Sequence, residues 1–284
     1  MIVKILGTAQ DAGIPHPNCF CENCKRARVD KNYQRLAASL SLHFEEETKW
    51  YMIDPTPDFK AQLAIVQRES RWQIMMDGIF LTHAHIGHYT GLMFLGKEAV
   101  STKQLPVMAG EKMCRFLSTH YPWKQLLDFD NIELKQLEIS QAYSLPEEAS
   151  IIPLCIPHRN EFSETFGFII QGKRKRLLYI PDIDRWEAWD VNLDEVMEGI
   201  DYCLIDGTFY SAKELKKIGR SYNDIPHPLI SESMETFKPY TNACKIYFTH
   251  FNHSNPAIGL EASYRENMEA NGFFVLEDGQ EFEL

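Results

Sequence analysis

The sequence predicts an α+β fold in which two mixed sheets pack face to face and helices cover their outer faces, an αββα sandwich. Two observations favour it. Short apolar segments typical of buried strands alternate with helix-like segments along the whole chain, and each half of the chain contains both kinds. The 284 residues show no Ser/Gly linker, low-complexity tract or repeat, so we expect one domain over residues 1–284.

The first half of the chain begins with a strand at once. Alternating segments at 37–44 and 49–53 predict a hairpin, which turns at an acidic run and ends in the Pro- and Asp-rich stretch 54–58. A helical period over 59–69 predicts a helix, and the apolar run 78–81 predicts a buried strand. A short helix, a strand at 106–110 and a helix at 111–120 are expected to follow.

The second half is denser in strands. The strands expected there lie at 132–137, 151–156, 166–171, 176–180, 202–205 and 245–249, with a closing pair near the C-terminus. The helices expected there lie at 185–198, 229–237 and 260–271. The basic run 173–176 lies between two of these strands and is expected to be a solvated hairpin turn.

Composition excludes several classes of protein. The chain is 44% hydrophobic and 24% charged, and it has no apolar run near the ~20 residues of a membrane span. Its formal charge of −11 disfavours general nucleic-acid binding but leaves room for a small anionic substrate held by a metal. Because no export signal precedes the first strand, we expect a cytoplasmic protein.

Three histidines crowd into one short stretch after the strand at 78–81. If that strand continues, His83 and His85 lie on one face at its end, and the chain then turns so that His88 approaches from a helix start. Imidazoles that converge from one turn can share a metal ion. The stretch therefore predicts a metal site.

Four more ligand-type residues each follow an apolar run. His158, Asp182, Asp206 and His250 come after the strands expected at 151–156, 176–180, 202–205 and 245–249. Ends of neighbouring strands meet at one edge of a sheet, so these side chains can converge with the three histidines. Any single one of them could instead be a cap or a buried polar group with its own partners.

At this point the chain resembles the metallo-β-lactamase fold hydrolases, most closely the branch that contains the pyrroloquinoline quinone biosynthesis protein B. The resemblance covers nearly the whole chain. Besides the histidines it rests on the stretches 7–13, 54–58, 204–209 and 252–256. The C-x-C-x-x-C spacing of Cys19, Cys21 and Cys24 is also similar to that of the phosphonate-pathway cyclic phosphodiesterase of this superfamily.

The resemblance implies two neighbouring metal positions. The matching ligands are His83, His85 and His158 at the first position, His88 and His250 at the second, and Asp182 as the carboxylate that bridges them. Asp54 matches a residue that orients the ligands without touching the metal. His227, accompanied by Asp206, matches the proton-donating histidine of the phosphodiesterases; the alternative for 225–228 is a rigid structural turn.

The three clustered cysteines predict a structural zinc site in a loop at about 16–25. Cysteines so close in sequence form poor disulfide pairs, which favours reduced thiols. A tetrahedral zinc needs a fourth ligand, and the phosphodiesterase resemblance implies His253, with His16 as a rival. Three free thiols are the remaining alternative.

One residue departs from the superfamily pattern, which has aspartate where this chain has Gly87. The second position then keeps only His88, His250 and the shared Asp182, and an aspartate at 87 is expected to strengthen it. The first hypothesis is a hydrolase that holds one or two divalent ions (zinc, manganese or iron) and uses a metal-bound hydroxide on a small-molecule ester or phosphodiester.

Two alternatives stay open. His88, His250 and Asp182 form a two-histidine, one-carboxylate set that suits an iron(II) hydroxylase or oxygenase, as in the quinone-biosynthesis branch. The loss of the motif carboxylate would also fit a degenerate protein that binds or carries a metabolite. A homodimer is a further expectation, in which Trp72, Trp123, Trp186 or Trp189 could anchor the interface, although these residues also suit a core.

Overall fold

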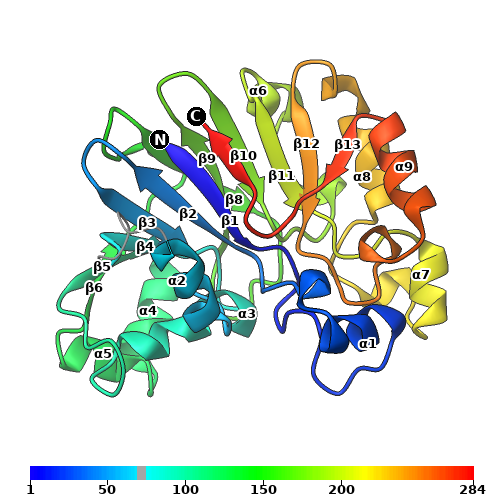
Figure 1. The fold of residues 1–284 in the computed structure, drawn as a ribbon. Helices are drawn as coiled ribbons and strands as arrows, with labels where there is room; N and C mark the ends of the chain where they lie inside the picture. Colours follow the sequence, from blue (N-terminus) through cyan, green and yellow to red (C-terminus); the bar gives the residue numbers. More distant parts are fainter. Residues whose placement is uncertain (69–74) are drawn as a thin grey trace.

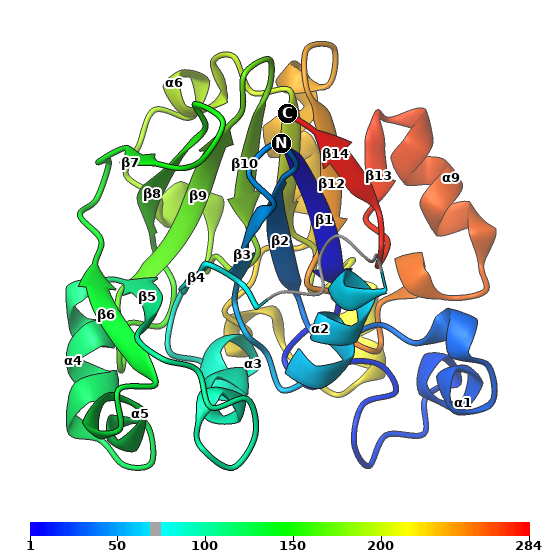
Figure 2. The ribbon, with the colours of Figure 1, turned by 60° about the vertical axis from the view of Figure 1, so that its left-hand side comes forward.

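The computed structural model describes residues 1–68 and 75–284 and confirms the predicted sandwich of two sheets (Figure 1). The first sheet has the order β14-β1-β2-β3-β4-β5-β6. Its strands are β1 (Ile2–Gly7), β2 (Ser39–Phe44), β3 (Lys49–Ile53), β4 (Gly78–Phe80), β5 (Leu105–Ala109), β6 (Ile132–Gln136) and β14 (Glu281–Glu283). The N- and C-termini lie close together at one edge of the molecule (Figures 1 and 2).

The second sheet has the order β13-β12-β11-β10-β9-β8-β7. Its strands are β7 (Tyr143–Ser144), β8 (Ser150–Ile156), β9 (Thr165–Gln171), β10 (Arg176–Ile180), β11 (Tyr202–Asp206), β12 (Lys245–Thr249) and β13 (Phe273–Val275). Strands β10 to β13 run parallel, which explains why β10 and β11 read as nearly continuous apolar segments buried on both faces.

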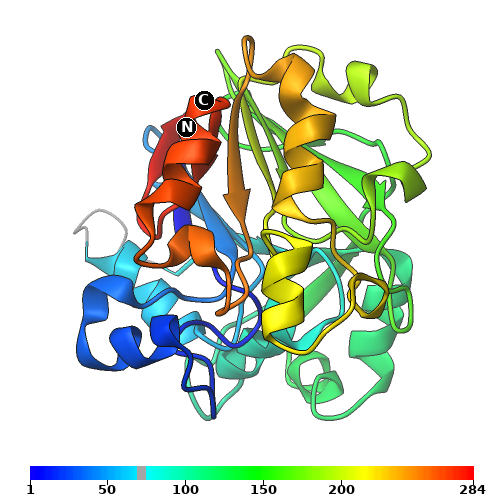
Figure 3. The same cartoon turned by 90° about the vertical axis from the view of Figure 1, so that its right-hand side faces the viewer.

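Helices cover the outer face of each sheet. They are α1 (Glu22–Val29), α2 (Phe59–Gln67), α3 (Ile86–Tyr89), α4 (Glu111–Thr119), α5 (Lys124–Asp128), α6 (Leu193–Met197), α7 (Ala212–Lys217), α8 (Ile230–Phe237) and α9 (Ala262–Ala270). Figure 3 shows α8 in amber and α9 in red-orange over the second sheet. Helices α2, α4 and α5 pack with the first sheet around Trp50 and Val107.

The core between the sheets follows strand alternation. Along β10, Leu177 and Tyr179 point into the inter-sheet cluster, whereas Leu178 and Ile180 belong to the cluster under α8 and α9. The inter-sheet cluster joins residues such as Val3 and Leu42 of the first sheet to those of the second. Burial on both faces of the sheets therefore fixes the register of the strands that carry the site.

Several expectations need correction. The helix expected at 185–198 is two short pieces, a 3₁₀ turn at Trp186–Ala188 and α6, because Asn192 caps a new helix after the interruption. The closing strand pair is also wrong: β13 pairs with β12 and β14 with β1, in different sheets. Strand β4 ends at Phe80, so His83 and His85 lie in a turn rather than on a strand face.

The expected zinc loop at about 16–25 runs into α1, which was not expected from the sequence. The last residue of the helix expected at 59–69, and Trp72, lie outside the described residues. Trp123, Trp186 and Trp189 are only 9%, 8% and 7% exposed, so they belong to the core and offer no exposed anchor for a dimer. Among the described helices, none has the length and apolar character needed to cross a membrane.

Candidate active site

The candidate site lies where strands of both sheets end. Strands β3 and β4 are parallel neighbours in one sheet, and β10, β11 and β12 are parallel neighbours in the other, so their carboxyl ends share an edge. The residues that follow these ends, together with those after β1 and β8, form the site. This convergence was expected from the sequence, and the structure brings the predicted residues together.

The three histidines assigned to the first metal position converge with their ring nitrogens. His83 Nε2 lies 2.9 Å from His85 Nδ1, and His158 Nε2 lies 3.3 Å from the same atom. Two nitrogens bound to one tetrahedral zinc at 2.0–2.1 Å would stand about 3.3 Å apart. The spacing of the three rings therefore suits one shared ion.

Asp182 lies between this group and the second one. Its Oδ1 is 3.5 Å from His158 Nε2, and its Oδ2 is 3.1 Å from His88 Nε2 and 3.2 Å from His250 Nε2. The carboxylate thus faces both sets of imidazoles, as the bridging role expected for it requires. His83, His88 and Asp182 also form a potential metal-binding group of their own.

Several buried polar atoms of the site lack well-aligned hydrogen-bond partners within the described ranges, and a metal ion would supply the missing interaction. His88 Nε2, His250 Nε2 and Asp182 Oδ1 are buried, yet they make no well-aligned hydrogen bond to any described residue. Burial lowers the pKa values of His83, His85 and His250, so these rings are neutral at physiological pH. These neutral imidazoles are donors that a divalent ion needs. Burial lowers the pKa of His88, but the carboxylates of Asp54 and Asp182 outweigh it and raise that pKa, so this ring would release a proton on binding the ion.

Asp54 orients His88. This fully buried carboxylate accepts hydrogen bonds from the Thr82 backbone N–H at 2.8 Å and the Thr82 hydroxyl at 2.7 Å, and its Oδ2 lies 2.8 Å from His88 Nδ1. The arrangement directs His88 Nε2 toward Asp182. Asp54 and His250 both have positive φ angles, +61° and +59°, a conformation that non-glycine residues keep mainly where surrounding structure enforces it.

His227 and Asp206 form a buried pair beside Asp182. His227 Nδ1 is 2.7 Å from Asp206 Oδ2 and 3.3 Å from Asp182 Oδ1. Burial alone would lower the pKa of His227, but the Asp206 carboxylate outweighs it and raises that pKa. Asp206 also accepts hydrogen bonds from Thr208 and from the Ile183 N–H, so its oxygens are fully engaged and it suits an orienting role better than that of a metal ligand.

The turn that carries His227 is held from behind by Arg185. The Arg185 guanidinium donates hydrogen bonds to the carbonyl oxygens of His227 at 2.6 Å, Tyr222 at 2.9 Å and Ile225 at 3.1 Å. The 225–228 segment is thus rigid, as its structural alternative supposed. That rigidity also fixes the imidazole over the site, so the two interpretations of this turn are compatible.

A cavity of about 220 Å³ opens onto these residues. Besides the histidines and Asp182, its walls include Arg159, Arg220, Phe209 and the loop residues Gln10 and Asp11. The exposed guanidinium groups of Arg159 and Arg220 lie beside the carboxylates of Asp11 and Glu161, and Arg159 forms an ion pair with Glu161 at 3.7 Å. Arg220 forms no ion pair with a described residue, so its charge on this wall is uncompensated.

The structure also brings the four residues of the expected zinc site together. Cys19 Sγ is 3.3 Å and Cys21 Sγ 3.5 Å from His253 Nδ1, and Cys24 completes the group. Sulfur and nitrogen ligands of a tetrahedral zinc would be about 3.6 Å apart. Burial lowers the pKa of His253 to about 4, so the ring is neutral and able to bind. The ring of the rival His16 contacts that of His253 at a centroid distance of 4.6 Å and an interplanar angle of 42°, and it lies outside the group.

Sequence reasoning missed three residues of the site. Asp184 Oδ1 lies 3.0 Å from His158 Nδ1, and Thr208 Oγ1 lies 3.0 Å from His250 Nδ1, so each fixes which nitrogen its histidine directs inward. Asp184 lies two residues after Asp182, and Thr208 lies within the stretch 204–209 on which the resemblance rests. Asp11, in the stretch 7–13, forms a potential metal-binding group with His88 and His250.

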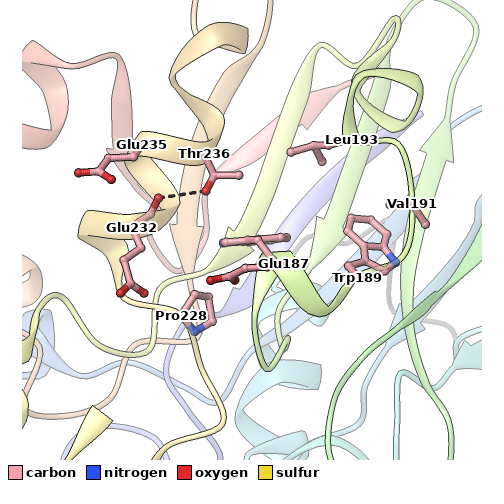
Figure 4. Close-up of a pocket in the computed structure, with 9 residues that line it drawn as sticks. Glu187, Trp189, Val191, Leu193, Pro228, Glu232, Glu235 and Thr236 are labelled. Carbon is pink, nitrogen blue, oxygen red and sulfur yellow. Dashed lines mark hydrogen bonds between the residues drawn. The ribbon is translucent and has the colours of Figure 1, made fainter. Parts of the chain in front are cut away.

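A second hollow, of about 440 Å³, is lined in part by Pro228, the residue after His227. Figure 4 shows it between the Trp186–Val191 segment and α8, with Glu187, Glu232 and Glu235 among its lining residues. None of its described lining residues is a histidine or cysteine. The metal-binding chemistry therefore belongs to the smaller cavity.

Comparison with known proteins agrees with this fold. Over its whole length the chain is 26% identical to the coenzyme PQQ synthesis protein B of Methylococcus capsulatus, with all of both chains covered, and it is 27% identical to that of Rhizobium meliloti, with 99% and 97% covered. The structure matches Zn²⁺-bound PqqB from Methylobacterium extorquens with a TM-score of 0.83 at 21% identity, covering all of both chains.

A diphosphatase of the PhnP family is also similar in structure, with a TM-score of 0.73 at 23% identity and coverage of 100% of this chain and 97% of the other. The model of the β-lactamase superfamily domain matches residues 49–251, which include His83, His158, Asp182 and His250. The chain therefore belongs to the β-lactamase superfamily domain family and has the metallo-β-lactamase fold.

Proposed function

We propose that this protein is a metal-dependent hydrolase that cleaves a small anionic ester, with phosphodiesters as the favoured class. The observation that carries the proposal is the complete set of three imidazoles, His83, His85 and His158, within reach of one ion and next to Asp182. Divalent ions held there would polarise the ester and lower the pKa of a bound water. The similarity in fold to a PhnP-family diphosphatase supports hydrolysis at a phosphorus centre.

Residues of the chain would orient the attacking water, protonate the leaving oxygen and attract the substrate. Asp182 orients the attacking water, and the pair of His227 and Asp206 protonates the leaving oxygen. His227 suits this step because Asp206 engages its Nδ1, whereas its Nε2 makes no hydrogen bond to a described residue and the ring lines the cavity. Arg159 and Arg220 would attract the anionic substrate to the cavity mouth.

The zinc proposed at Cys19, Cys21, Cys24 and His253 is structural, because four protein ligands leave no open position for a substrate. Such a site requires reduced thiols, so we propose the cytoplasm as the compartment.

A second candidate is an iron(II) hydroxylase. The set of His88, His250 and Asp182 favours iron(II) chemistry, and the full-length likeness to PQQ synthesis protein B relatives favours a role in the synthesis of a quinone cofactor. The three-imidazole group remains unexplained by this candidate, because one iron at the second position would not use it. We therefore place the hydrolase first.

The test loads the purified chain with zinc, manganese or iron(II) and measures cleavage of a nitrophenyl phosphodiester beside oxygen uptake. We expect ester cleavage with zinc or manganese and a loss of more than about 100-fold in His158→Ala, because even the partners that orient metal ligands are worth 10–100-fold. His120→Ala, at an exposed histidine on the end of α4, is the matched control and should keep the parent rate.

Oxygen consumption with iron(II) in the absence of ester cleavage would instead support the hydroxylase. A chain that holds only its cysteine-bound zinc and turns over neither substrate would support the metabolite carrier.

A further inference from the structure

The space beside Gly87 is filled by another residue. A Cβ built on Gly87 would lie 2.1 Å from Oδ1 of Asp11 and 2.5 Å from the Asp11 Cα, far closer than real Cβ atoms approach other atoms. Gly87 lies in α3 with no positive φ, so its backbone would accept any L-residue. The glycine is required by the position of Asp11 and not by the conformation of the helix.

Asp11 reaches the two histidines of the second metal position. A carboxylate oxygen of Asp11 and one ring nitrogen each of His88 and His250 all lie within 4.8 Å of one another. The Asp11 carboxylate makes no hydrogen bond or ion pair with any residue in the described ranges, and the buried His88 Nε2 and His250 Nε2 make no well-aligned hydrogen bond there either. With Asp182 Oδ2 these atoms form a set of two nitrogens and two oxygens.

The backbone holds Asp11 in this place at some cost. Its φ of +24° is rare for any residue with a side chain. Hydrogen bonds tie its flanks to the segment after His250: the Gln10 N–H donates to the Phe251 carbonyl at 2.9 Å, and the Phe251 N–H donates to the Thr8 carbonyl at 2.8 Å. The backbone of Asp11 is strained, and the residues beside it are hydrogen-bonded to Phe251, which follows His250 in the chain. This placement suits a metal ligand better than a residue that only packs.

We propose that Asp11 is a metal ligand at the second position and supplies the carboxylate that Gly87 lacks. The superfamily pattern has this carboxylate in α3, at the position of Gly87, whereas here it comes from the loop after β1. The absence of a side chain at Gly87 leaves space for it. The inference rests on the proposed metal-dependent function and sharpens it, because it gives the site two fully built ion positions instead of one full and one depleted.

This assignment corrects the expectation drawn from Gly87 alone. The second position is not reduced to His88, His250 and Asp182, since Asp11 adds a fourth donor. An aspartate at position 87 would not simply strengthen the site, because its Cβ would occupy the space of the Asp11 carboxylate. Gly87→Asp would exchange one carboxylate for another.

The test measures zinc bound per chain, and zinc affinity, after dialysis at fixed free zinc. Asp11→Asn keeps the size of the side chain and removes its charge. We expect this variant to hold one ion fewer than the parent, or to bind that ion at least about tenfold more weakly. Glu161→Gln is the matched control, because it removes the same charge from the wall of the same cavity at an exposed side chain; it should bind as the parent does.

A second variant reaches the same result by a different route. Gly87→Ala removes no ligand atom but places a methyl group where Asp11 lies, so it should lose the same ion. The double variant Asp11→Asn, Gly87→Ala should bind zinc no worse than either single variant, because both changes disable one interaction. Thermal unfolding and the thiolate-to-cobalt absorption of the cysteine site verify that each variant is folded.

Parent-like zinc binding by Asp11→Asn would overturn the assignment, and so would a parent chain that takes up only one ion besides the cysteine-bound one. Parent-like binding by Gly87→Ala would overturn the inference that the Asp11 carboxylate needs the space beside Gly87. None of these measurements uses ester cleavage. A parent that holds both ions and cleaves no ester would therefore refute the hydrolase proposal while supporting the role of Asp11.

Discussion

Replacing His253 by alanine tests the cysteine site directly. Its Nδ1 lies 3.3 Å and 3.5 Å from the sulfur atoms of Cys19 and Cys21, close to the spacing of ligands on one zinc. Structural zinc in small sites contributes roughly 10–16 kcal/mol of apparent binding free energy, so one ligand of four is worth about 3 kcal/mol. We therefore expect His253→Ala to bind zinc on the order of 100-fold more weakly than the parent.

The assay uses cobalt in place of zinc. Thiolate-bound cobalt gives a charge-transfer absorption that the sulfur-free active site cannot produce, so the titration reports the cysteine site alone. His16→Ala is the matched control, because the His16 ring contacts that of His253 but its Nδ1 lies 2.8 Å from the Pro17 carbonyl oxygen and outside the ligand group. Parent-like cobalt affinity in His253→Ala, or an equal loss in His16→Ala, would refute the assignment.

Three further predictions concern the rest of the chain. Asp54→Asn should weaken binding of the second active-site ion about 10–100-fold, since the amide orients His88 less well; equilibrium dialysis measures it. Arg220→Gln should raise KM for an anionic ester more than it lowers kcat, and a larger effect on kcat would contradict a steering role. Burial raises the pKa of Glu214 to about 7, above the 4.5 of a free glutamate. Between these two pKa values Glu214 retains a proton in the folded chain that it loses in the unfolded chain, so its contribution to stability falls by up to about 3 kcal/mol as pH rises from about 4.5 to about 7. Urea unfolding at a series of pH values should show the free energy of unfolding of the parent falling relative to that of Glu214→Gln over this range, and parallel profiles would contradict the prediction.

The sequence predicted the parts of the site that follow from strand order. His158, Asp182, Asp206 and His250 each end an apolar run, and the parallel neighbours β10, β11 and β12 bring three of these ends to one edge. No long-range knowledge was needed for that convergence, because the carboxyl ends of parallel strands must share an edge.

Other features lay beyond sequence reasoning because they depend on contacts between distant segments. The assignment of β13 and β14 to different sheets depends on which edge each strand meets, and their length and composition do not reveal it. Asp11 and Gly87 are separated along the chain by β2, β3 and β4, so the sequence around either residue does not show that the Asp11 side chain lies in the space beside Gly87. The sequence alone showed that Gly87 stands where the motif has a carboxylate. The proposal that Asp11 replaces it depends on the folded structure, which brings Asp11 next to Gly87.

The two metal-binding groups are joined through the same pair of chain segments. The N-terminal segment supplies Asp11 to the active site and Cys19, Cys21 and Cys24 to the cysteine group, whereas the segment after β12 supplies His250 to the first and His253 to the second. Between them the Phe251 backbone forms hydrogen bonds with Thr8 and Gln10.

A zinc held by Cys19 and His253 would therefore fasten the loop of Asp11 to the loop of His250. Its removal should weaken binding of the second active-site ion, although no active-site ligand is changed. In His253→Ala we accordingly expect a loss of affinity at that position while the group of His83, His85 and His158 keeps its own. Unchanged affinity at the second position would mean that the Phe251 hydrogen bonds alone hold the two loops together.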